Sequence, residues 1–313
     1  MTHVPFLQPT FPSAADVGAD YAAILARGIF SNGGPLDASL VEAVEAWVGN
    51  GVHACTVSSG TAGLELAITA TFDRSKPWGL VPAFTFAAGP MAVSPSGFQP
   101  MFLDADPDTW QPSLRHGLEI LTHRRGEVGG ILIGPTFGVA DPAIDDWEAM
   151  ADRFGLPLVF DSAAGFGGTH VSGEPLGSRG TCEVFSMHAT KTLAVGEGGL
   201  ITSRDTALID AIVSQRNFGF DTARRSVRVG TNAKLTELAA AIGIRQMRVL
   251  ELRVVKRRSV LEQYRCLLEP LGATFQPGVT SAAPPFVSAL APSASARRRA
   301  LNLLELADVE CRD

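Results

Sequence analysis

Residues 185–202 contain the side chains best suited to covalent chemistry. Lys191 is the one lysine in a run of small, polar and apolar residues, Ser186 lies five residues before it, and a Gly-Glu-Gly-Gly turn follows at 196–199. An amine held in such surroundings can attack a carbonyl group as a nucleophile. The alternative is a lysine whose charged end reaches water from a buried loop. The two interpretations predict different neighbours for Lys191.

An anion site is predicted at Gly60, Thr61 and Ala62. These residues follow Ser59 and lie between an expected strand at 54–57 and an expected helix at 62–72. The N–H groups at the start of a helix can bind a phosphate, and the Thr61 hydroxyl would add a further hydrogen bond. The alternative is an ordinary helix cap by Ser59 or Thr61.

Two further residues extend this set. Asp161 ends an apolar run at 158–160, where a carboxylate is costly to bury without a partner. A protonated ring nitrogen would be such a partner, although a salt bridge or a helix cap would serve as well. Phe86 could cover one face of a ring, or it could be a core phenylalanine. An amine, an acid, an anion site and an aromatic face are together what pyridoxal phosphate requires.

The elements that must position these residues alternate between strands and helices. Strands are expected at 54–57, 80–82, 99–104, 130–133, 156–161, 182–186 and 199–202, and helices at 13–28, 38–49, 62–72, 113–124 and 143–154. This order predicts an α/β fold with a mostly parallel sheet covered on both faces. Ligands of such sheets bind at the carboxyl ends of the strands. Ser59, Thr61, Asp104, Asp161 and Ser186 all lie at or just past such ends.

The remaining third of the chain has a different pattern. A long helical stretch is expected at 233–268, followed by a strand at 284–290 and a helix at 297–306. We therefore expect a large domain with an N-terminal arm at 1–250 and a small α/β domain at 251–313.

Composition excludes several classes of protein. The chain has 313 residues with a formal net charge of -6 and 19% charged residues, so no basic excess indicates a nucleic-acid partner. The four cysteines are far apart, which argues against a metal site. No signal peptide and no apolar run long enough for a membrane span are evident, so we expect a cytoplasmic protein.

The motifs together resemble the DegT-type (StrS-like) pyridoxal-phosphate-dependent sugar aminotransferases. The resemblance covers most of residues 20–260 and rests on Ser59-Gly60-Thr61-Ala62, on the segments 81–86, 102–104, 160–163, 185–191 and 196–199, and on Gly230-Thr231-Asn232 with the helix after it. It implies the aspartate-aminotransferase-like fold (fold type I).

The resemblance also implies roles for individual residues. Lys191 would carry the cofactor as a Schiff base and then act as the proton shuttle, and Asp161 would pair with the pyridine nitrogen. Gly60, Thr61, Ala62 and Ser186 would bind the phosphate, and Phe86 would stack on the ring. Asn232 would reach the phosphate in a neighbouring subunit, so a homodimer with shared sites is implied.

Three features depart from the family pattern. Ala164 stands where Gln or His is frequent, and Lys234 stands where Arg is frequent. The chain also ends after Glu310 without several dozen residues that the family usually has. The resemblance therefore implies a shortened small domain.

We expect amino transfer from an amino acid, with glutamate implied as donor, to a keto group of a nucleotide-linked deoxysugar. Alternatives are a cyclitol or other secondary-metabolite ketone as acceptor, or a non-catalytic homologue that binds the cofactor. A sugar dehydratase of the same family would carry histidine in place of Lys191. The loops at 30–35 and 218–229 are expected to line the substrate site, with arginines available for phosphates.

Overall fold

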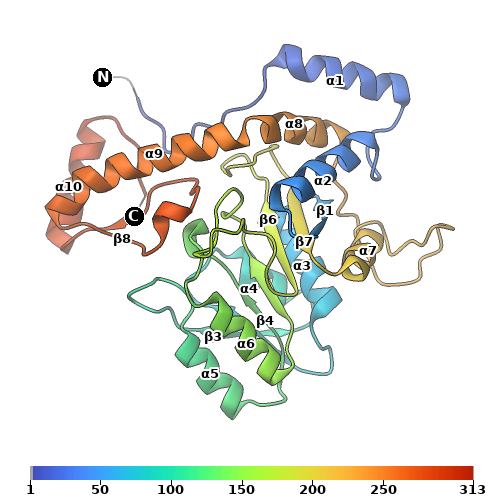
Figure 1. Ribbon diagram of the computed structural model, residues 1–313, viewed down its shortest axis with the longest axis horizontal. Helices are drawn as coiled ribbons and strands as arrows, with labels where there is room; N and C mark the ends of the chain where they lie inside the picture. Colours follow the sequence, from blue (N-terminus) through green and yellow to red (C-terminus); the bar gives the residue numbers. More distant parts are fainter. Residues whose placement is uncertain (1–2, 313) are drawn as a thin grey trace.

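Seven short apolar segments pair into one sheet in the computed structural model, which describes residues 3–312 (Figure 1). The strands are β1 (His53–Val57), β2 (Trp78–Pro82), β3 (Gln99–Leu103), β4 (Val128–Ile133), β5 (Leu158–Asp161), β6 (Cys182–Ser186) and β7 (Gly199–Ser203). Their order is β1-β7-β6-β5-β4-β2-β3. Only β7 runs antiparallel to its neighbours β1 and β6. The predicted α/β fold with a mostly parallel sheet is confirmed.

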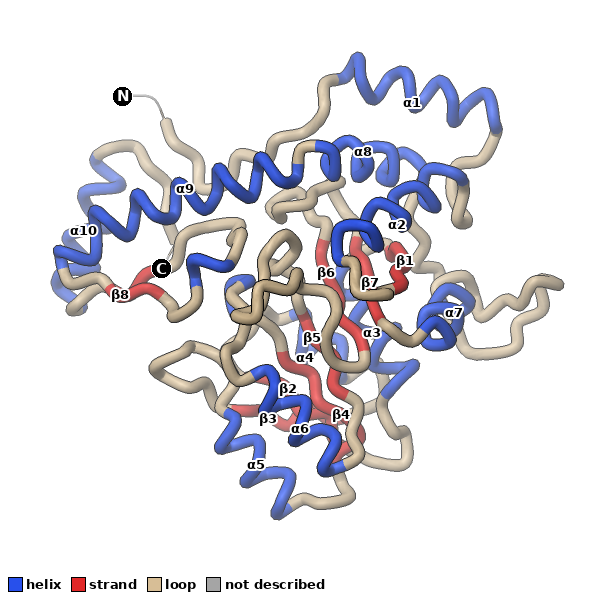
Figure 2. The backbone as a smooth tube through the Cα atoms, in the orientation of Figure 1, coloured by secondary structure: helices blue, strands red, loops and turns tan. Residues whose placement is uncertain are grey.

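Side chains alternate between the two faces of the sheet, as the period of a strand requires. In β4, Leu132 packs on one face, against a group formed by α3 (Gly60–Thr71), α4 (Ala88–Val93) and α7 (Thr206–Gln215). Ile131 and Ile133 pack on the other face, against α5 (Leu114–His123) and α6 (Ile144–Phe154). At the β1 end, that second face is covered by α2 (Pro35–Val48) and α8 (Glu237–Arg248). Figure 2 shows the strands lying between the two helical layers.

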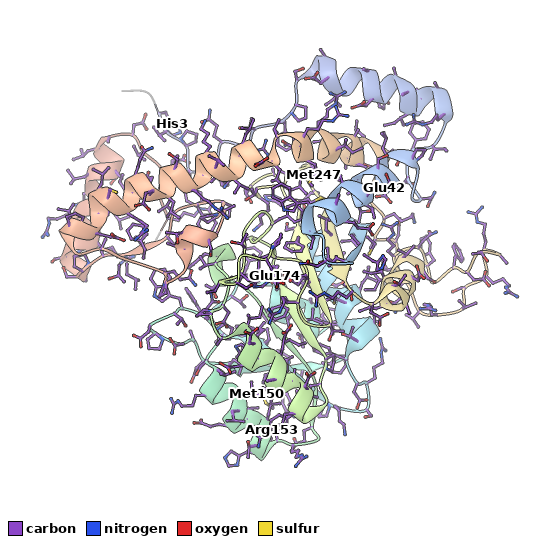
Figure 3. The ribbon with its side chains drawn as sticks, in the orientation of Figure 1. His3, Glu42, Met150, Arg153, Glu174 and Met247 are labelled. Atoms are coloured by element: carbon purple, nitrogen blue, oxygen red, sulfur yellow. The ribbon has the colours of Figure 1, made fainter. Side chains whose placement is uncertain are left out.

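The helical stretch predicted at 233–268 is two helices. α8 ends at Arg248 and α9 (Leu250–Leu268) begins two residues later, because Val249 leaves the helical region with φ -113° and ψ 7°. The two helices form a rod across the top of Figure 1, with α1 (Ala14–Arg27) beside α8. Met247, labelled in Figure 3, lies at their junction. No helix in the described range is long and apolar enough to cross a membrane.

The last part of the chain forms a second, small unit of structure. It contains a two-stranded sheet of β8 (Thr274–Phe275) and β9 (Ala289–Leu290), followed by α10 (Ala294–Leu306). The strand predicted at 284–290 is wrong except for its last two residues. Pro284 and Pro285 have no N–H to donate to a strand partner, and the carbonyl of Pro284 instead accepts from Arg257.

The N-terminal arm lies against this C-terminal unit, because Val4 pairs with Val309 and His3 with Asp308. The division into domains at 250/251 stays a prediction, and residues 1, 2 and 313 at its outer ends lie outside the described range. Helix α7 was not among the predicted elements. Its ten residues span too few turns for an apolar periodicity to stand out in the sequence.

Candidate active site

The residues of the predicted anion site lie at the start of α3. Ser59 caps this helix, since its hydroxyl accepts from the N–H of Ala62 at 3.1 Å. The cap that was the alternative interpretation is therefore present, and it occupies Ala62. Within residues 3–312 no acceptor is described for the N–H groups of Gly60 and Thr61. Both are oriented by the helix as donors for an anion.

Ser186 lies directly beside this turn. A Cβ added at Gly60 would lie 3.0 Å from Cβ of Ser186 and 3.5 Å from its Oγ, so only glycine leaves the space between them open. Ser186 is at the carboxyl end of β6, and its hydroxyl also accepts from the N–H of His188 at 3.2 Å. Two free N–H groups and a hydroxyl thus surround one cradle, which fits a phosphate group.

Lys191 is held in the loop that joins β6 to β7. The loop folds back on itself: Met187 donates to the carbonyl of Gly198 at 2.8 Å, and Ala189 donates to that of Gly196 at 2.9 Å. Gly196 has φ +103°, a conformation that favours glycine. The turn returns the chain so that β7 forms beside β6, as the Gly-Glu-Gly-Gly sequence predicted.

Asp161 and Lys191 are coupled electrostatically across the ends of neighbouring strands. Burial lowers the pKa of the Lys191 ammonium, and the charge of Asp161 opposes this shift. Burial raises the pKa of the Asp161 carboxyl, while the N–H of Ala163, at 3.2 Å, and the charge of Lys191 oppose the rise. An acid and an amine of perturbed pKa in one place are typical of a catalytic site.

The other two predicted residues lie in more open positions. Phe86 precedes α4 and its side chain is 81% exposed, so it is not a core phenylalanine. Asn232 is exposed and accepts from Nζ of Lys234 at 2.7 Å. Its neighbour Ala233 accepts from the N–H of Ser58 at 2.8 Å, which places the segment near β1. No described contact joins Phe86 or Asn232 to Lys191 within this chain.

A buried polar network that the sequence did not predict lies at β1, just before the phosphate cradle. Arg216 donates to the carbonyl of Thr56 and, at 2.6 Å, to its hydroxyl, and it pairs with Asp37 at 3.2 Å. All three side chains are almost fully buried. The network joins α2, β1 and the end of α7 just before the phosphate cradle. The three residues are far apart in the sequence, so no local pattern links them.

The position of Ala164 is closely packed. A Cβ at Gly138 would lie 2.3 Å from the carbonyl oxygen of Ala164, so the loop at 134–138 rests directly on the loop after Asp161.

The residues of the site fit pyridoxal phosphate at three points: the cradle of Gly60, Thr61 and Ser186 fits its phosphate, Asp161 fits its ring nitrogen, and Lys191 fits its aldehyde carbon. No group of three or more His, Cys, Asp or Glu within the described range is arranged to hold a metal ion.

Comparison with known proteins gives one family. The family model of the DegT/DnrJ/EryC1/StrS aminotransferases matches residues 14–313. The Mycobacterium bovis protein Mb3436c is 39% identical over 312 residues, which are 99% of this chain and 76% of that protein.

Two solved structures show the same fold. A putative PLP-dependent aminotransferase from Bacillus cereus has a TM-score of 0.91 and 28% identity, covering 99% of this chain and 85% of that one. DesI, solved in the presence of its TDP-sugar product, has a TM-score of 0.87 and 30% identity, covering 100% and 79%.

Proposed function

The chain belongs to the DegT/DnrJ/EryC1/StrS family of pyridoxal-phosphate-dependent aminotransferases, and from this premise we propose its substrates and the roles of its residues. We propose that it transfers an amino group from glutamate to the keto group of a nucleotide-linked deoxysugar. The observation that carries the site assignment is the coupling of Lys191 to Asp161 beside the open cradle of Gly60 and Ser186.

Each residue of the site has a separate task. Bound pyridoxal phosphate supplies an aldehyde that joins to amines and a protonated ring that withdraws electrons. Asp161 keeps a proton on the ring nitrogen, because its negative carboxylate accepts a hydrogen bond from the ring N–H and stabilises the positive charge. The N–H groups of Gly60 and Thr61 and the hydroxyl of Ser186 bind the phosphate. Phe86 covers the ring.

Lys191 also moves the proton that amino transfer requires. Its Nζ removes a proton from the carbon that bears the donor's amino group, and returns a proton to the acceptor carbon in the second half of the reaction. A base must be uncharged to accept a proton, and burial favours the uncharged amine of Lys191.

The second subunit enters the proposal through Asn232 and Phe86. Both are exposed in the single chain although both are assigned to the cofactor. A neighbouring copy that brings its Asn232 to the phosphate would explain this exposure, and a homodimer with shared sites follows. A cytoplasmic location stays a prediction from the composition.

The nucleotide-sugar class is supported by three features. DesI, which is 30% identical along the whole chain, was solved with a TDP-sugar. The loop at Gly28–Pro35 together with Ala38 encloses an open pocket of about 720 Å³. The exposed Arg228, in the loop at 218–229, is the type of residue that binds phosphates. These two loops are proposed to hold the sugar nucleotide.

The test combines a spectrum with a product mass. The protein loaded with pyridoxal phosphate should show a visible absorbance band that glutamate diminishes, and a keto-sugar nucleotide added next should gain an amino group by mass. Lys191→Ala should lose the band, whereas Lys256→Ala, an exposed lysine on α9, should keep it.

Each part of the proposal can fail separately. A band that persists in Lys191→Ala would refute the assignment of the lysine. A band that glutamate leaves unchanged but another amino acid diminishes would refute the donor. Amination of a free cyclitol in preference to every sugar nucleotide would replace the acceptor class.

A further inference from the structure

Thr192, the residue directly after Lys191, is fixed by two segments from the last quarter of the chain. Its side chain is 2% exposed. Its carbonyl oxygen accepts from Nη1 of Arg253 at 2.9 Å, and its hydroxyl donates to the carbonyl of Ala283 at 2.8 Å. The backbone beside the lysine is therefore held from outside its own loop.

Arg253 also reaches the loop through a second residue. Its Nη2 donates to Oε1 of Gln246 at 2.5 Å, and Nε2 of Gln246 donates to the carbonyl of Ala194 at 3.0 Å. Gln246 is 2% exposed, so these hydrogen bonds are protected from water. Arg253 thus holds the loop directly at Thr192 and, through Gln246, at Ala194.

The next turn of α9 holds the segment 281–284. Arg257 donates to the carbonyl of Pro284 at 2.8 Å, and Arg258 donates to those of Ser281 and Ala282 at 2.7 and 3.1 Å. Helix α9 and this segment are therefore one unit, which runs away from the sheet toward α10 (Figure 1). Thr192 contacts both parts of it.

We propose that Arg253 and Thr192 are positioning residues that hold Lys191 in register with Asp161 by anchoring its loop to α9 and to residues 281–284. The inference rests on the proposed role of Lys191. A hydrogen bond from a guanidinium is stronger than one between neutral groups, and a buried carbonyl that loses its donor must move or stay unpaired. A shift of about 1 Å in a reacting group lowers a rate on the order of a hundredfold.

The experiment uses variants of Thr192 and Arg253 and a matched control from the same helix. Arg253→Met and Thr192→Val remove the contacts to the lysine loop. Arg257→Met removes only the contact to Pro284 and leaves Ser281 and Ala282 bound to Arg258. Arg253 and Arg257 are both half-buried residues of α9 that donate to backbone carbonyls, so a general loss of stability should be similar.

The readout is the rate at which hydroxylamine releases the lysine-bound cofactor, followed by absorbance, together with the separate changes in kcat and KM. Arg253→Met and Thr192→Val should release the cofactor about fivefold or more faster and lose kcat with KM little changed. Arg257→Met should stay within about twofold of the parent. Arg253→Lys, which keeps one donor, should lie between them and covers the case in which Arg253→Met does not fold.

Equal release rates in Arg253→Met and Arg257→Met would overturn the inference. So would Arg253 and Thr192 variants that have a lower melting temperature but keep the parent's release rate and kcat. If Lys191→Ala keeps the absorbance band, the proposed function fails first. If Lys191→Ala loses the band while the Arg253 and Thr192 variants behave as the parent, only the positioning role fails.

Discussion

At the scale of single residues, the chemistry depends on an acid and an amine that would be costly to bury separately. Asp161 and Lys191 share a partly buried place at the ends of β5 and β6, where each charge opposes the effect of burial on the other's pKa. Binding of a ring nitrogen by Asp161 would complete this arrangement. The pair is therefore suited to a cofactor that brings its own positive charge.

Replacing Asp161 tests this assignment. Asp161→Asn should keep the shape of the site but lose the charge that holds the ring proton, so kcat should fall about a hundredfold or more. Asp104→Asn is the control, because Asp104 also follows a strand but its side chain is 81% exposed. A kcat in Asp161→Asn close to that of the control would contradict the role.

His170 predicts a loss of stability in acid. It is 2% exposed, neither of its ring nitrogens makes a described hydrogen bond, and burial, aided by the charge of Arg179, lowers its pKa to about 4. Between pH 6.5 and pH 4 the unfolded chain binds a proton that the folded ring does not, so stability falls as pH decreases. The contribution from this residue should be about 2 kcal/mol lower at pH 5 than at pH 7.

Urea unfolding at both pH values measures this contribution. His170→Gln should lose less stability than the parent between pH 7 and pH 5. The neighbouring Glu183 is common to both proteins, so its raised pKa, which acts in the opposite direction, cancels in the comparison. The same loss in both proteins would show that His170 is not the titrating group.

At the scale of elements, α2 begins where it does because of a residue 200 positions away. Glu237 is fully buried, and its two carboxylate oxygens accept from the N–H groups of Leu36 and Asp37 at 3.0 and 2.8 Å. A Cβ at Gly34 would lie 2.6 Å from Cδ of Glu237, so the glycine lets the carboxylate approach. This contact sets the loop of the proposed substrate pocket against α8.

Removing that carboxylate should destabilise the fold. Glu237→Ala leaves the buried N–H of Asp37 and the partly buried N–H of Leu36 without acceptors, and it should lower the free energy of unfolding by roughly 2 to 4 kcal/mol. Glu237→Gln keeps an acceptor and should cost about 1 kcal/mol. Denaturant unfolding should show Glu251→Ala, an exposed acid in the first turn of α9, within about 0.5 kcal/mol of the parent. A Glu237→Ala variant as stable as Glu251→Ala would rule out this capping role.

The helices and strands themselves were largely predictable. Apolar spacing located β1 to β7 to within a few residues because buried strands are short, apolar and followed by turn formers. The break between α8 and α9 was not predictable, because Val249 has no sequence feature that ends a helix. The excess strand at 284–290 came from an apolar run that begins with two prolines, and the carbonyl of Pro284 bonds to Arg257 of α9 instead.

At the scale of the whole molecule, the proposed sharing of sites between two subunits predicts complementation. Lys191→Ala and Asn232→Ala should each have little activity alone, whereas a refolded mixture should regain about a quarter of the parent's activity. Half of the dimers in the mixture combine both chains, and one of their two sites then has both residues intact. Activity measured after refolding together and after mixing folded proteins separates exchange from simple addition. No gain on refolding together would place Asn232 in the same subunit's site or outside it.

The sequence by itself determined the parts of the site and the type of fold. Lys191, Asp161 and the turn at Gly60 are each recognisable because strand ends, helix starts and glycine turns have local patterns, and local patterns follow from backbone geometry. Only the tertiary structure showed that Ser186 adjoins Gly60, that Arg216 joins Thr56 to Asp37, and that Arg253 holds the residue after Lys191. These contacts link residues far apart in the sequence, and such contacts form only when sheet and helices have packed together.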